Sequence, residues 1–337
     1  MKNRTFFLAI ASTLALGACG GGGGSSGSTG GSMPVQTSAL TPITAASSTQ
    51  TAATGYTAAA LIDNSSSSIT DVLTGVSIGG PGISAVSPVI KLAKRVVGRS
   101  GAQLLTGVTM SENCSGGGAV TIDANLRNAQ TFSNGDTLTL TAKNCVEDGN
   151  NLNGNLTITL SDVSGDLVNT PVGTVTMDTR FTGFSIASGS DTATINGDMK
   201  IAFRSASATS SSLAISGKSL QTTEQKTGAA VANLTLSDYS LTGNTDGTTT
   251  TSSASLSLSG NANGLGQFAY TVKNIQPFVS VGTAMPGSGS LIINGAASSV
   301  TVTALSASSV RLDYSAKGDG AITQTTTLGW SELLASI

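Results

Sequence analysis

The feature that most constrains the fold is an alternation of apolar and polar residues that recurs through residues 104–337. Stretches such as "DTLTLTAKN" and "GNLTITLSD" place leucine or isoleucine at every second position, with threonine and other polar residues between them. Successive side chains of a β-strand point to opposite faces of its sheet, so this period of two predicts strands with one buried and one polar face. About fourteen such segments can be counted, and the predicted fold class is all-β.

Short turn-forming pairs punctuate these segments. Asn-Gly begins at residues 134, 153, 196, 263 and 294, and Asp-Gly begins at residues 148, 246 and 319. Both pairs readily adopt the positive φ that tight hairpins need, and strands joined by hairpins are antiparallel. The sequence therefore predicts a large antiparallel meander over residues 104–337.

The alternation changes phase in two of the predicted strands. In "TMDTRFTGFSIAS" the apolar positions shift near Thr182-Gly183, and in "LTLSDYSLTG" they shift between Leu236 and Tyr239. Such a shift indicates a β-bulge, which bends a strand and is often built around glycine. We expect these bends to curl the sheet into a barrel, a half-barrel or a two-layer sandwich.

The composition restricts the function more than it specifies it. Charged residues make up 10% of the chain and the net charge is −2, so there is no basic surface of the kind that binds nucleic acid. Histidine is absent, which removes the commonest general base and metal ligand. No activated serine, phosphate-binding loop or clustered acidic pair is recognisable, and we predict no catalytic residue, no metal site and no cofactor.

The N-terminus has the pattern of an export signal. Lys2 and Arg4 precede 13 uncharged residues, and small residues follow before Cys19. The segment Leu16-Gly17-Ala18-Cys19 resembles the lipobox of bacterial lipoproteins. This resemblance implies cleavage before Cys19 and attachment of lipid to its thiol. Because residue 20 is not aspartate, it also implies sorting to the outer membrane of a Gram-negative bacterium. The alternative is ordinary signal cleavage, with Cys19 an incidental thiol.

The predicted organisation follows from this anchor. Residues 1–18 form the signal peptide, and residues 19–55 form the lipidated cysteine and a tether rich in Gly and Ser. About 30 residues of flexible coil span roughly 30 Å, so the tether holds the β domain away from the membrane. Residues 56–103 form a mixed segment with short helical stretches, and residues 104–337 form the β domain.

An amphipathic helix is predicted within the mixed segment, over residues 87–98. Ser87 and Pro88 suit its start and Gly98 suits its end. Its apolar side comprises Val89, Ile90, Ala93, Val96 and Val97, and its basic side comprises Lys91, Lys94, Arg95 and Arg99. The basic side can face acidic lipid at a membrane surface, or the helix can pack across a sheet with these residues in water.

Two further cysteines, Cys114 and Cys145, lie in the β domain. An exported protein folds in an oxidising compartment, so these two residues are expected to form a disulfide. A metal site is the alternative, and it would need further ligands of the right kind.

Three functions are compatible with these features. The first is a non-enzymatic lipoprotein that binds an envelope component, such as a partner protein, or has a structural role. The second is a carrier that holds an apolar ligand inside a curled sheet. The third is a hydrolase, such as a glycosidase, that uses two carboxylates.

Overall fold

The computed structural model describes residues 39–60, 108–128, 132–147, 149–165, 172–228, 231–262 and 264–337. The predicted signal peptide, Cys19, residues 20–38 of the tether and the predicted helix 87–98 lie outside these ranges.

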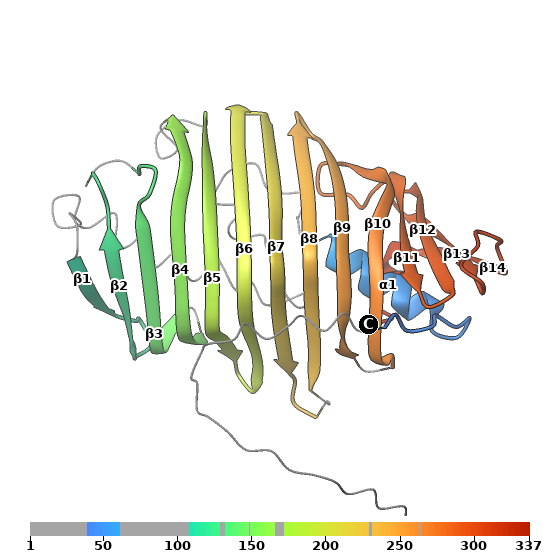
Figure 1. The fold of residues 1–337 in the computed structure, drawn as a ribbon, viewed down its shortest axis with the longest axis horizontal. Helices are drawn as coiled ribbons and strands as arrows, with labels where there is room; N and C mark the ends of the chain where they lie inside the picture. The colour runs from blue at the N-terminus through green and yellow to red at the C-terminus, as the bar shows by residue number, and fades with distance from the viewer. Residues whose placement is uncertain are drawn as a thin grey trace, which may run out of the picture. The chain divides into compact units, whose positions relative to one another are not determined.

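The described strands form one antiparallel sheet in which each strand pairs with its neighbours in the sequence (Figure 1). The predicted all-β meander is confirmed. Among the described residues, two short helices flank the strands, α1 (Ser48–Ala59) and α4 (Trp330–Leu334). The fourteen strands are β1 (Val108–Asn113), β2 (Ala119–Asn125), β3 (Thr137–Glu147), β4 (Asn150–Gly165), β5 (Gly173–Ser188), β6 (Asp191–Ser207), β7 (Ser210–Gln225), β8 (Ala232–Asp246), β9 (Thr249–Ala262), β10 (Gly266–Val281), β11 (Ser288–Gly295), β12 (Ser298–Ser306), β13 (Ser309–Ser315) and β14 (Gln324–Gly329).

The predicted curling of the sheet is wrong. The strand order runs from β1 at one edge to β14 at the other, and the sheet is neither closed nor strongly curled. It is therefore not a barrel, a half-barrel or a two-layer sandwich. Both phase shifts seen in the sequence do mark register shifts, between Phe181 and Phe184 and between Ser237 and Ser240.

Register shifts recur in most neighbouring strand pairs from β3 to β10 of this open sheet. Register shifts occur in the β3–β4, β4–β5, β5–β6, β6–β7, β8–β9 and β9–β10 pairs, and regular pairing resumes beyond each of them. The β7–β8 pair keeps its register throughout, whereas in these other pairs the strands continue together past the irregularity. We call this row of irregularities the bulge line.

At the bulge line, some backbone N–H groups do not pair with the backbone of the adjacent strand. Side chains of neighbouring strands accept their hydrogen bonds instead. The Asn153 Oδ1 atom accepts a hydrogen bond from the Asn144 N–H at 2.7 Å. The Asn196 Oδ1 atom accepts one from the Gly183 N–H at 2.7 Å. The Asp198 carboxylate accepts hydrogen bonds from the N–H groups of Lys218 and Ser219. The Tyr239 hydroxyl donates a hydrogen bond to the Asp198 carbonyl at 2.6 Å. These particular N–H groups are therefore paired although the strand pairing is irregular there.

Two predicted hairpin pairs belong to the bulge line instead. Asn153-Gly154 lies inside β4 and Asn196-Gly197 lies inside β6. The glycines have φ values of 100° and 123°, so the positive φ expected of a turn is present, but within a continuous strand. A bulge and a turn make the same demand on glycine, which is why the dipeptide alone does not distinguish them.

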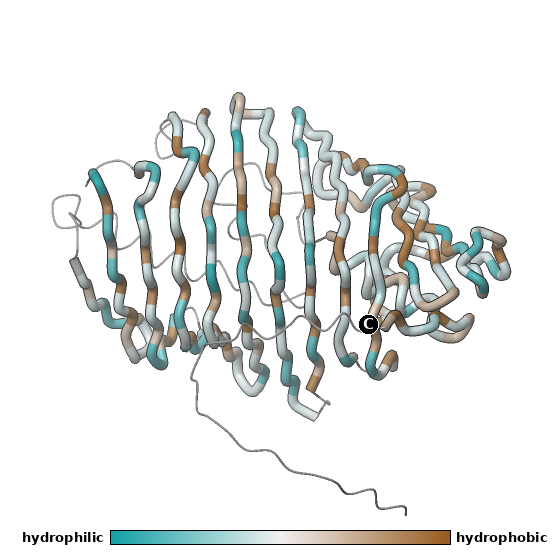
Figure 2. The backbone as a smooth tube through the Cα atoms, viewed as in Figure 1, coloured by the Kyte–Doolittle hydropathy of each residue, from teal (hydrophilic) through white to brown (hydrophobic). Residues whose placement is uncertain are grey.

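Most strands have one apolar and one polar face, as the alternation predicts. Figure 2 shows apolar and polar positions alternating along the strands. In β6 the residues on the apolar face include Met199, Ile201 and Phe203, which are at most 4% exposed, whereas Lys200 and Arg204 on the opposite face are exposed. We use "apolar face" and "polar face" in this sense for the whole sheet.

Helices α1 and α4 cover the C-terminal part of the apolar face. Helix α1 contacts strands β9 to β13 and also contacts α4. The Tyr56 ring packs against Phe278 and Trp330, with centroids 5.4 and 4.7 Å away. A Cβ atom on Gly55 would lie 2.5 Å from the Ile293 side chain, so this glycine lets the helix approach β11 closely.

The folded part of the chain begins earlier than predicted. Helix α1 starts at Ser48, and the backbone of Thr41 already bonds to Ala269 of β10 and to Ala296. Ile43 is 2% exposed. The predicted tether of residues 19–55 therefore extends too far, because its Ala, Thr and Ser residues fold against the sheet.

Candidate functional site

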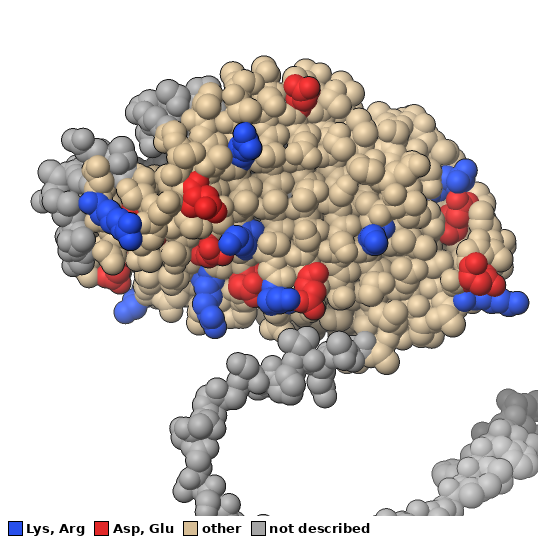
Figure 3. All heavy atoms as spheres, turned by 45° about the horizontal axis from the view of Figure 1, so that its top comes forward, with Lys and Arg blue, Asp and Glu red and all other residues tan. Residues whose placement is uncertain are grey.

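The polar face of the sheet is rich in hydroxyl and amide groups and has few charges. In the view of Figure 3, acidic and basic side chains are sparse, and large areas carry neither. Several cross-strand pairings of this face join threonine and serine, as in the row of Ser219, Ser237 and Ser257. Such a surface offers many neutral hydrogen-bond donors and acceptors.

A depression of about 410 Å³ opens on this face over β5 to β8. We call it the hydroxyl groove. Phe203 and Leu213 border the groove, but their buried side chains lie on the apolar face. The polar-face residues that line it are Thr174, Thr176, Ala202, Arg204, Ser212, Ala214, Thr242 and Asn244.

Two alanines account for the hollow. In one cross-strand row, Ala202 and Ala214 pair with each other and lie between Thr176 and Thr242. The alanine side chains are shorter than those of their neighbours, so the middle of the row is low. The volume falls within the range of small-molecule sites, although the groove is open to solvent.

The adjacent row supplies the strongest donor of the groove. It consists of Thr174, Arg204, Ser212 and Asn244, paired across β5 to β8. The Arg204 guanidinium is exposed and takes part in none of the ion pairs found between described residues. A guanidinium presents two parallel N–H groups to a carboxylate or phosphate. No carboxylate lines the groove within the described part of the chain.

The acidic residues near the groove and along the bulge line have structural partners. Asp178 lies 3.6 Å from the Lys200 ammonium, in the row beside the alanines. Asp238 lies 2.9 Å from Lys218, and this hydrogen bond raises the Lys218 pKa. Burial is the main cause of the raised pKa values of Glu224 and Tyr239. Both residues lie outside the hydroxyl groove.

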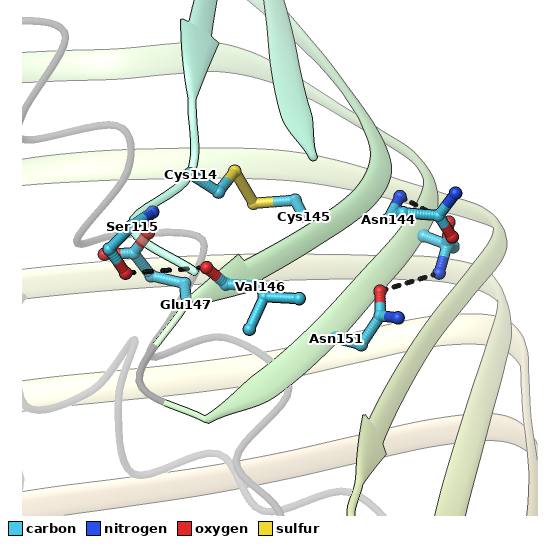
Figure 4. Close-up of a disulfide and its surroundings, with 8 residues drawn as sticks. Cys114, Ser115, Asn144, Cys145, Val146, Glu147 and Asn151 are labelled. Atoms are coloured by element: carbon cyan, nitrogen blue, oxygen red, sulfur yellow. Dashed lines mark hydrogen bonds between the residues drawn. A yellow bond between two sulfur atoms is a disulfide. The ribbon is translucent and has the colours of Figure 1, made fainter. Parts of the chain in front are cut away.

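The predicted disulfide between Cys114 and Cys145 is confirmed (Figure 4). It joins the turn after β1 to β3, with the two Cα atoms 5.3 Å apart. The same turn also bonds to β3 through its backbone, where the Gly116 N–H donates to the Val146 carbonyl at 2.9 Å. The disulfide therefore fastens the β1–β2 hairpin to the sheet.

One group of potential metal ligands occurs among the described residues, and it is explained by this disulfide. Cys114, Cys145 and Glu147 bring ligand atoms within 4.8 Å of one another. Both sulfur atoms are already bonded, and the Glu147 carboxylate accepts a hydrogen bond from the Ser115 N–H at 3.1 Å. The cluster is therefore structural.

The other predicted site residues lie outside the described residues. These are the lipidation site Cys19 and the basic residues Lys91, Lys94, Arg95 and Arg99. Within the described ranges, no helix combines the length and the apolar character needed to cross a membrane.

The hydroxyl groove was not predicted from the sequence. Its residues come from four strands and meet only through the register of the sheet, and its alanines look like ordinary strand residues. The one available signal is Arg204, a basic residue on the polar face of a chain with few charges. No protein-family model, curated protein or solved structure matches this chain.

Proposed function

We propose that this protein is a lipoprotein of the Gram-negative outer membrane that binds an acidic, hydroxyl-rich saccharide on the polar face of its sheet. The role is non-enzymatic. The observation that carries the binding proposal is the hydroxyl groove, in which hydroxyl and amide groups surround a single exposed guanidinium.

The chemistry of the groove favours a saccharide. Sugar hydroxyls both donate and accept hydrogen bonds, as do the side chains of Thr176, Ser212 and Thr242. Arg204 adds a fixed positive charge that favours a carboxylate or phosphate on the ligand. A neutral sugar would leave that guanidinium bonded to water alone.

The two alternative functions have less support. An apolar ligand would be carried on the apolar face, whereas the hydroxyl groove opens on the polar face. A two-carboxylate hydrolase needs paired acids beside the bound sugar. The described carboxylate nearest in register to the alanine row, Asp178, is paired with Lys200 instead.

The lipid anchor rests on the lipobox and is tested by labelling. Cells that express the wild-type chain and are fed radioactive palmitate are expected to yield a labelled protein in the outer-membrane fraction. The Cys19→Ala variant is expected to lose the label and leave that fraction, because its lipid attachment atom is gone. The control is the Cys114→Ser, Cys145→Ser variant, which keeps Cys19 and should keep the label. A labelled Cys19→Ala variant would contradict the anchor.

The binding site is tested with defined saccharides. Isothermal titration calorimetry is expected to detect binding of an oligogalacturonate and much weaker binding of a neutral maltooligosaccharide of equal length. Replacing Arg204 with alanine should weaken the acidic ligand about tenfold or more, since a charge-assisted hydrogen bond contributes about 1.5–3 kcal/mol.

Arg180 supplies the matched control, because it is an exposed arginine of β5 outside the groove. The Arg180→Ala variant should bind like wild type. Equal losses in the two arginine variants would indicate nonspecific attraction, and equal binding of both saccharides would show that the guanidinium does not select an acid. Either outcome argues against the groove as the site.

A further inference from the structure

Two exposed basic side chains on the polar face have no carboxylate among their cross-strand partners. Arg204 of β6 lies between Thr174 and Ser212 in its row. Lys273 of β10 lies between Ser255 and an isoleucine of β11. Neither cation takes part in the ion pairs found between described residues. Both therefore keep a positive charge that an acidic ligand can use.

The register of the sheet gives the separation of these two cations. It places Lys273 in one cross-strand row with Lys200, by way of Ser255, Ser240 and Ser216. Lys200 precedes Arg204 by four residues on β6. Lys273 is thus displaced from Arg204 by four strand spacings and by four residues along the strands, which together give roughly 20–25 Å.

The surface between the two cations carries hydroxyl groups. The hydroxyl groove covers its first part, as far as Thr242 of β8. Ser253 of β9 pairs with Thr242, and Ser255 follows on the polar face of the same strand. Asp238 of β8 is already bonded to Lys218 at 2.9 Å. A saccharide that leaves the groove in this direction can therefore continue to form neutral hydrogen bonds.

Carboxylates stand beside the groove in two other directions. Asp162 of β4 is exposed, and its backbone carbonyl accepts a hydrogen bond from the Thr174 hydroxyl at 2.7 Å. Asp246 is exposed two residues beyond Asn244, at the end of β8. Like charges repel, so both carboxylates disfavour an acidic chain that extends over them. The direction toward β10 leads to a cation instead.

We propose that the ligand is an acidic oligosaccharide with at least two acid groups, which runs from Arg204 across β7 to β9 and reaches Lys273. This assignment rests on the proposed function and extends it. One acid group bonds to the Arg204 guanidinium in the hydroxyl groove, and a second lies beside the Lys273 ammonium. The ligand class is a polyanionic chain, because a single acidic sugar is too short to meet both cations.

Calorimetric titration of the full-length protein with ligands of two lengths tests this extension. One ligand is digalacturonate, and the other is an oligogalacturonate whose extended length exceeds the separation of Arg204 and Lys273. Lys273→Ala should weaken the long ligand about threefold to fivefold, the range expected of an exposed charge pair, and leave digalacturonate unchanged. Lys143→Ala is the matched control, because Lys143 is an exposed lysine on the polar face of β3, away from this path. It should change neither ligand.

A second variant tests the path between the cations. Ser253→Asp places a negative charge on β9, and it too should weaken only the long ligand.

Arg204→Ala separates failure of the extension from failure of the proposed function. If Arg204→Ala weakens both ligands and Lys273→Ala weakens neither, the groove stands as the site and the extension to Lys273 is overturned. If Arg204→Ala weakens neither ligand, both proposals are overturned. Equal losses in Lys273→Ala and Lys143→Ala would indicate nonspecific attraction and would also overturn the extension.

Discussion

Replacing Gly197 with alanine is expected to lower the free energy of unfolding by about 3–5 kcal/mol. Gly197 has a φ of 123°, which side chains rarely allow, and an added Cβ would lie 2.0 Å from the Ser219 carbonyl oxygen. The neighbouring β7 backbone would have to move, and it is held there by the Asp198 carboxylate. Urea denaturation followed by circular dichroism measures the change.

Gly183 provides the control on the same bulge line. Its φ is 55°, but an added Cβ would meet nothing within 4 Å. Gly183→Ala should therefore cost only about 1 kcal/mol, the conformational part of the penalty. Similar losses in the two variants would mean that close backbone approach does not hold the bulge line together.

The second large effect concerns the disulfide at the β1 edge. Replacing Cys114 and Cys145 together with serine is expected to lower the free energy of unfolding by about 3–4 kcal/mol. The bond closes a loop between residues 31 apart in the sequence, and its loss returns conformational freedom to the unfolded chain. Because β1 pairs only with β2 among the described strands, the variant should also lose hydrogen-exchange protection first in the β1–β2 hairpin.

A reducing agent separates this effect from the substitutions themselves. Reduced wild-type protein should unfold at the same urea concentration as the double serine variant, and the reducing agent should leave that variant unchanged. If the oxidised and reduced proteins unfold together, the hairpin is fastened by its backbone contacts, such as the bond from Gly116 to Val146.

The sequence predicts the strands well because the alternation within each strand shows which of its residues lie on the apolar face. Leu138 and Leu140 alternate with threonines whatever their neighbours are, and the shift at Thr182-Gly183 correctly marks a bulge. The predictions that fail concern features that depend on contacts between different strands. The pair Asn196-Gly197 predicts a hairpin, and this prediction is wrong. Only its contacts with β5 and β7 identify it as a bulge.

Helix α1 and the hydroxyl groove escaped prediction for related reasons. The α1 sequence "STQTAATGYTAA" has the composition of a linker, and it is helical where Gly55 and Tyr56 meet β11 and the Trp330 ring. The groove depends on Ala202 and Ala214 being opposite each other on adjacent strands. Neither property is visible within one short window of sequence.

The meander also determines the order in which contacts can form during synthesis. Each strand pairs with the strand made just before it, so most of the sheet can grow as the chain lengthens. The N-terminal segment is different, because Ile43 bonds to Ser298 and Tyr314, 255 and 271 residues further along the chain. The residues made early must wait for strands that are made nearly last. A nascent chain that stops before β12 can form its earlier hairpins, but it leaves Ile43 without Ser298 and Tyr314.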